Sequence, residues 1–84
     1  MDIAKKIEDV LRAGLDIKEL IVENQSYLHR GHAGDDGTDQ THFLVKVVSP
    51  EFKGMSRVSR QRLVFSLLQH EMKFIHALSL DLQY

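Results

Sequence analysis

The sequence predicts an α+β fold with the element order α-β-β-α-β, and hydrophobic spacing carries that prediction. Two segments place apolar residues three or four positions apart, as amphipathic helices do. Three shorter segments are rich in β-branched residues or alternate apolar with polar residues, as strands do. The helical segments are residues 2–13 and 57–73, and the strand segments are 17–23, 43–48 and 77–83. A chain of 84 residues has room for one compact core, so we expect residues 1–84 to form a single domain.

The first predicted helix has one apolar stripe and a polar start. Asp2 can accept hydrogen bonds from the free N–H groups at the beginning of the helix, and Gly14 suits the position just after its last turn. The stripe consists of Ile3, Ile7, Val10 and Leu11. This side of the helix is expected to pack against the core.

The first two strands enclose a long polar segment. In the first strand Leu20 and Val22 share one face, and in the second strand the residues of one face are Phe43, Val45 and Val47. Residues 24–42 between the strands are polar and rich in glycine and aspartate. A loop of this length in so small a domain is unusual and is often functional.

The second half of the chain predicts a strand, a crossover helix and a further strand. Ser56 suits the N-cap of the helix over 57–73. Its apolar stripe is expected to comprise Val58, Phe65, Leu68 and Met72, widened by Val64 and Leu67. A strand–helix–strand unit favours parallel strands, whereas the first two strands are expected to be antiparallel. The predicted fold is therefore a three-stranded mixed sheet with both helices on one face.

Composition excludes several classes of function. The chain has no cysteine, which rules out disulfides, thiolate zinc sites and an iron–sulfur site built from its own thiolates. We find no nucleophile elbow, Walker loop or GxGxxG motif, and we therefore expect no enzyme. The start of the chain lacks a signal-peptide pattern, and no run of about 18 apolar residues occurs, so a cytoplasmic protein without membrane contact is expected.

Five histidines are the most unusual feature of the composition. His76 shares the parity of the inward-facing leucines of the last strand, so its ring is expected to point toward the core side. A fixed imidazole at His76 and a mobile one at His29 or His32 would form a two-ligand metal half-site. The alternatives are a hydrogen-bonded strand histidine, solvated loop histidines, or a simple zinc site made by all three. His42 precedes the second strand and could orient the loop, although an ordinary structural histidine is the favoured interpretation. We assign no function to His70 in the last turns of the second helix.

A basic cluster at the start of the second helix is the other candidate site. Its members are Lys53, Arg57, Arg60 and Arg62. Arginines at a helix N-terminus can bind phosphate, so this cluster could bind the backbone of a nucleic acid. The alternative is a solvated helix face, because the net charge of the chain is −1 and no aromatic residues interleave with the arginines.

The chain from Asn24 to its end resembles the BolA-like family, on short motifs that are weak singly but specific in this order and spacing. The motifs are Asn24-Gln25-Ser26, Ser26-x-x-His29, Gly31-His32-Ala33-Gly34, Thr41-His42-Phe43, Val47-Val48-Ser49-x-x-Phe52-x-Gly54, Ser56-Arg57-Val58-x-Arg60-x-Arg62 and Ile75-His76-Ala77-Leu78-Ser79-Leu80. One departure is Gln61, where the family often has a histidine.

The resemblance implies a fold similar to the class II K-homology (KH) domain and a non-catalytic role in iron–sulfur cluster trafficking, assembly or iron regulation. It implies that a [2Fe–2S] cluster bridges this protein and a monothiol glutaredoxin, whose cysteine and bound glutathione hold one iron. The family's C-terminal histidine ligand falls on His76, and its variable loop ligand falls on His29 or His32. Alone, the protein is expected to hold no cluster and to be a monomer or weak homodimer. The alternative that the family suggests is a DNA-binding transcriptional regulator.

Overall fold

The structure is a computed structural model that describes residues 2–26 and 42–84. The elements follow the predicted order, with two short 3₁₀ helices, η2 and η3, added to it. They are α1 (Ile3–Gly14), β1 (Glu19–Asn24), β2 (His42–Val48), η2 (Pro50–Phe52), α2 (Arg57–Leu67), η3 (Glu71–Lys73) and β3 (Ala77–Gln83). No helix in the described part of the chain is long and apolar enough to cross a membrane.

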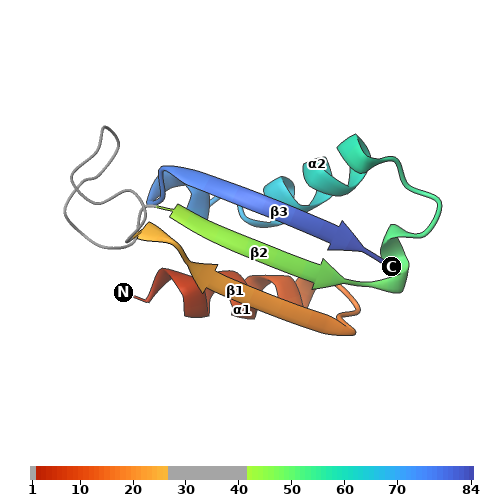
Figure 1. The fold of residues 1–84 in the computed structure, drawn as a ribbon, viewed down its shortest axis with the longest axis horizontal. Coiled ribbons are helices and arrows are strands. Elements are labelled where there is room, and N and C mark those ends of the chain that lie inside the picture. Colours follow the sequence, from red (N-terminus) through yellow and green to blue (C-terminus); the bar gives the residue numbers. More distant parts are fainter. Residues whose placement is uncertain (1, 27–41) are drawn as a thin grey trace.

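The three strands form one mixed sheet in the order β1-β2-β3, with β2 in the centre (Figure 1). β1 and β2 are antiparallel, and Leu20 lies opposite Val47. β2 and β3 are parallel, and Phe43 lies opposite Leu78. The predicted strand directions are therefore confirmed, and both β1 and β3 are edge strands.

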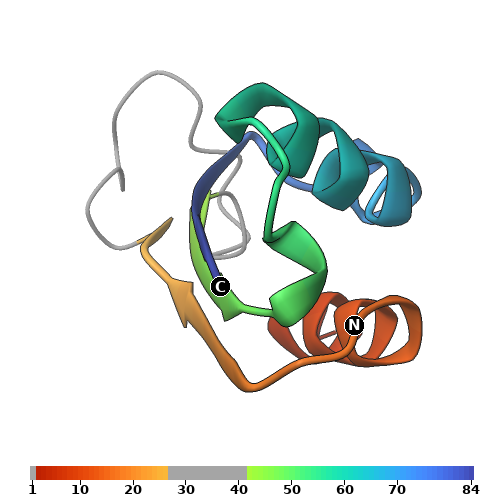
Figure 2. The ribbon, with the colours of Figure 1, turned by 90° about the vertical axis from the view of Figure 1, so that its right-hand side faces the viewer.

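Both helices cover the same face of the sheet, as Figure 2 shows. The inward face of β2 supplies Phe43, Val45 and Val47, which are buried as the alternation predicted. Between sheet and helices they meet a buried set from the rest of the chain: Ile3, Ile7, Leu11, Leu15, Phe52, Val64, Leu68 and Ile75. The described residues thus form two layers around one core, and none of their helices covers the opposite face of the sheet.

The beginning of α1 is as predicted, but its end is not. The side chain of Asp2 accepts a hydrogen bond from the N–H of Lys5 at 3.2 Å. Gly14 belongs to the last turn of the helix, and Leu15 caps it by donating its N–H to the carbonyl of Leu11 at 3.0 Å. A Cβ at position 14 would lie 2.8 Å from Cδ2 of Leu67, so a larger residue there would require the end of the Leu67 side chain to shift.

The second helix is shorter than predicted. Ser56 caps it as expected, but α2 ends at Leu67 and a turn leads into η3. Tightening the chain here brings Ile75 into the core just before β3 begins. The predicted stripe was also wrong in part: Val64 and Leu68 are buried, whereas Val58 is 53% exposed and Phe65 is 37% exposed.

Candidate functional site

Two histidines meet at one end of the sheet. His42 opens β2, and His76 directly precedes β3. The parallel register places His42 opposite Ala77, the residue after His76. The two imidazole rings lie 5.3 Å apart between centroids, with their planes inclined by 49°.

The two histidines differ in how they are held. His42 is only 9% exposed, and its N–H donates to Oγ of Ser26 at 3.1 Å. Its carbonyl accepts a hydrogen bond from the N–H of Gln25 at 2.8 Å. His76, in contrast, is exposed, so its ring does not point into the core as expected. The alternation of β3 begins only at Ala77, and the position before the strand does not follow it.

The other predicted histidines do not join this pair within the described structure. His29 and His32 lie outside the described residues, so their part in a site stays a prediction. His70 lies between α2 and η3 and not in a helix C-terminus, and its ring contacts Phe74 edge-on at 5.3 Å. Within residues 2–26 and 42–84 no group of three or more histidine and acidic side chains could hold a metal ion.

The described residues at this end of the sheet offer imidazole nitrogens and no thiolate. An exposed imidazole can donate a ring nitrogen to iron, whereas a chain without cysteine has no thiolate to offer. Sequence reasoning gave His42 no part in a metal site and considered only that it could orient the loop. The signal that could have found it is the strand register, because parallel pairing of β2 with β3 brings their first residues together.

The predicted basic cluster is divided by the structure. Arg60 is partly buried, and its guanidinium donates to the carbonyls of Met55 and Leu82, both at 3.1 Å. It also lies 5.1 Å from the centre of the Tyr84 ring. Arg60 thus ties α2 to the end of β3 instead of offering its charge to a phosphate. The other members, Lys53, Arg57 and Arg62, are exposed.

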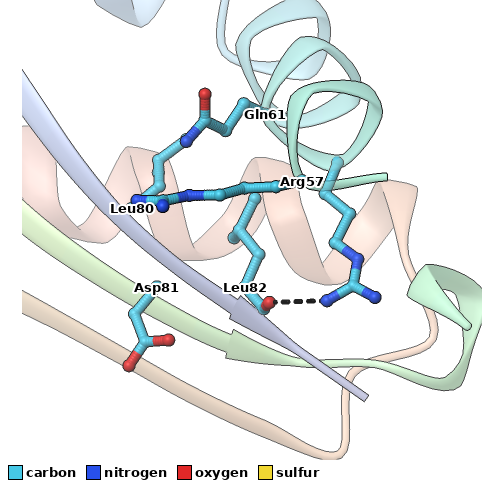
Figure 3. Close-up of a pocket in the computed structure, with 6 residues that line it drawn as sticks. Arg57, Gln61, Leu80, Asp81 and Leu82 are labelled. Carbon is cyan, nitrogen blue, oxygen red and sulfur yellow. Dashed lines mark hydrogen bonds between the residues drawn. The ribbon is translucent and has the colours of Figure 1, made fainter. Parts of the chain in front are cut away.

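A groove lies between the start of α2 and the second half of β3 (Figure 3). It has a volume of about 240 Å³ and is lined by Arg57, Arg60, Gln61, Leu80, Asp81 and Leu82. Asp81 accepts a hydrogen bond from the side-chain amide of Gln83 at 2.8 Å. Arg57 forms no ion pair or hydrogen bond with any described residue, and the Asp81 carboxylate points away from it in Figure 3, so the positive charge of Arg57 is unpaired.

Sequence and structure comparisons agree on the family. The chain matches the family model described as "BolA-like protein" over residues 11–83. It is 46% identical over 80 residues to the chloroplastic protein BOLA1 of Arabidopsis thaliana, covering 92% of this chain and 50% of that protein. It is 37% identical over 81 residues to the DNA-binding transcriptional regulator BolA of Escherichia coli, covering 95% of this chain and 73% of that protein.

Among solved structures, the BolA domain of SufE1 from Arabidopsis thaliana superposes with a TM-score of 0.85 at 42% identity, covering 99% of this chain and 92% of that domain. The chain spans only half the length of the chloroplastic BOLA1 protein, so the likeness concerns the domain and not the whole relative. The element order, the sheet and the matched residues all lead to one conclusion: this chain belongs to the BolA-like protein family.

Proposed function

We propose that this chain is a non-catalytic adaptor that shares a [2Fe–2S] cluster with a monothiol glutaredoxin. The observation that supports the proposal is the position of His76, an exposed imidazole beside the buried His42 at the end of the sheet. A ligand to a shared cluster must be held in place and still be reachable by another protein. His76 meets both conditions, because β3 follows it directly and its side chain is exposed.

The division of ligands follows from chemistry. His76 and one of the two loop histidines, His29 or His32, would hold one iron through neutral nitrogen donors. The glutaredoxin cysteine and glutathione would hold the other iron through sulfur. Neutral imidazoles replace charged thiolates in this arrangement, so the mixed cluster should have a higher reduction potential than an all-thiolate one.

The biological role of such an adaptor would be cluster trafficking, cluster assembly or iron regulation, and we place it in the cytoplasm. The testing experiment is co-expression of the chain with the monothiol glutaredoxin of its own organism. We expect a mixed complex whose absorption and electron-paramagnetic spectra differ from those of the glutaredoxin homodimer, with nitrogen coupling at iron. A mixture that shows only the homodimer spectrum in the presence of glutathione would rule the proposal out.

A DNA-binding regulator is the second candidate. It is supported by the name of the Escherichia coli relative and by the exposed side chains of Lys53, Arg57 and Arg62. The net charge of −1 and the engagement of Arg60 weigh against it. A salt-dependent shift of a labelled duplex that is lost in the triple alanine variant of the three exposed residues would favour it.

A further inference from the structure

The outer edge of β3 presents backbone groups to solvent. Among the strands of residues 2–26 and 42–84, β3 has a neighbour on one side only, which is β2. Ser49 donates its N–H to the carbonyl of Gln83 at 2.8 Å, so Gln83 directs its backbone groups toward β2. Alternate residues of a strand point their backbone groups in opposite directions within the sheet plane. Leu78, Leu80 and Leu82 therefore direct their N–H and C=O groups outward.

One of these outward groups is already occupied. Arg60 donates to the carbonyl of Leu82, which blocks the C-terminal end of the edge. No described residue bonds to the outward groups of Leu78 and Leu80. Such a row of unpaired donors and acceptors is a template for another strand.

The groove beside this edge adds a chemical preference. Its volume of about 240 Å³ is smaller than most cofactor sites, which range over roughly 300–1,000 Å³, and suits a single side chain. In an added strand, the side chain opposite Leu80 would lie on the same face as Leu80, within about 5 Å. That position is beside Arg57, whose charge has no described partner. A carboxylate is the side-chain group that complements it.

We propose that the outer edge of β3 binds an extended acidic segment of a partner protein. The segment adds to the sheet as a fourth strand beside Leu78 and Leu80, and one of its carboxylates pairs with Arg57. This docking needs no metal, and it goes beyond the proposed sharing of a cluster.

A second copy of this chain fits the edge less well. Two β3 edges paired in an antiparallel manner would bring two unpaired Arg57 side chains to the same interface. The second copy would also meet the Arg60 guanidinium on the Leu82 carbonyl. An acidic strand avoids the first problem and needs only the part of the edge that Arg60 leaves open.

The test is a nuclear magnetic resonance titration of the whole chain with a defined probe. The probe is an acetylated and amidated heptapeptide of alternating valine and glutamate, and its control has lysine in place of glutamate. We expect the glutamate peptide to shift the amide signals of Leu78 and Leu80, and the lysine peptide to bind at least five-fold more weakly. Two further peptides carry methyl groups on the backbone nitrogens of either the valines or the glutamates, and they test strand pairing. Methylation should weaken binding only at the backbone nitrogens that face β3, because only those nitrogens donate hydrogen bonds to it. One methylated peptide should therefore lose binding while the other keeps it.

A charge reversal tests the role of the groove. Arg57→Glu is expected to weaken binding of the glutamate peptide at least five-fold and to strengthen binding of the lysine peptide. Arg62→Glu is the matched control, because Arg62 is exposed on the same helix but does not line the groove, and it should leave the preference unchanged. Shifts confined to other amides, equal binding of both methylated peptides, or an unchanged preference in Arg57→Glu would overturn the proposal. A duplex DNA that shifts these amides when the peptide does not would also overturn it.

Discussion

The ring of His76 lies 5.3 Å from the ring of His42, and one ring is exposed while the other is almost fully buried. The pair exists because β2 and β3 run parallel and begin at the same end of the sheet. The backbone of His42 is fixed by Ser26 and Gln25, so the buried ring gives the exposed ring a rigid neighbour. The proposed function assigns ligation of the cluster to His76, and the buried His42 lies beside it as a fixed neighbour.

His76→Ala is expected to abolish the spectrum of the mixed cluster with a monothiol glutaredoxin and to leave the fold intact. The reason is that the side chain is exposed, so its loss should change the free energy of unfolding by no more than about 0.5 kcal/mol. Absorption and circular dichroism of the purified complex measure the first effect, and urea unfolding measures the second.

His70→Ala is the matched control for that variant. His70 is also an exposed histidine, but it lies between α2 and η3 and contacts Phe74. The control should retain the full cluster spectrum. A mixed spectrum of normal strength in His76→Ala would remove His76 from the list of ligands.

The choice of loop ligand leads to a second prediction. Only two histidines, His29 and His32, lie in the segment that connects β1 and β2. Because the proposed half-site needs one loop ligand beside His76, a single one of the variants His29→Ala and His32→Ala should lose one of the two nitrogens coupled to iron. Pulsed electron-paramagnetic resonance of the reduced mixed complex measures this coupling. If both variants keep two coupled nitrogens, the second ligand does not come from this loop.

Ser26→Ala should destabilise the protein because it removes the acceptor of a buried backbone N–H. Oγ of Ser26 accepts from the N–H of His42 at 3.1 Å, and both residues are buried. Losing the acceptor of a buried hydrogen bond costs on the order of 1 kcal/mol of unfolding free energy. Ser79→Ala, at an exposed position of β3, is the control and should change it by less than about 0.5 kcal/mol. Equal urea midpoints for the two variants would show that the Ser26 hydrogen bond contributes nothing.

Arg60→Ala is expected to loosen the C-terminal end of β3. The guanidinium bonds the carbonyls of Met55 and Leu82 and lies against the ring of Tyr84. Hydrogen bonds to charged groups contribute about 1.5–3 kcal/mol, and partial exposure places the expected loss toward the lower end of that range. Arg62→Ala serves as the control, since Arg62 is exposed, and it should be nearly neutral. Hydrogen exchange at Gln83, whose backbone groups face β2, should accelerate in the first variant alone.

The sequence predicted the strands well because their signals are local. The alternation of Leu78, Leu80 and Leu82 and the inward face of β2 require only period-two spacing. The engagement of Arg60 could not be predicted in this way, because its acceptor on Leu82 is set by how α2 packs against β3. The meeting of His42 and His76 likewise depends on strand register and not on any motif. Periodicity thus indicates which residues face the core, and packing decides which polar groups meet.

The register of α2 is where periodicity was ambiguous, and it gives the last prediction. Sequence spacing predicted one stripe that holds Val58 and Phe65 as well as Val64 and Leu68, but only Val64 and the C-cap residue Leu68 are buried. Leu68→Ala should therefore cost about 2–5 kcal/mol of unfolding free energy, because it leaves a cavity in the core. Phe65→Ala removes a larger side chain from a position that is 37% exposed, so it should cost less than about 1 kcal/mol. Urea unfolding of the two variants compares them directly. A larger loss for Phe65→Ala than for Leu68→Ala would mean that α2 presents its other side to the sheet.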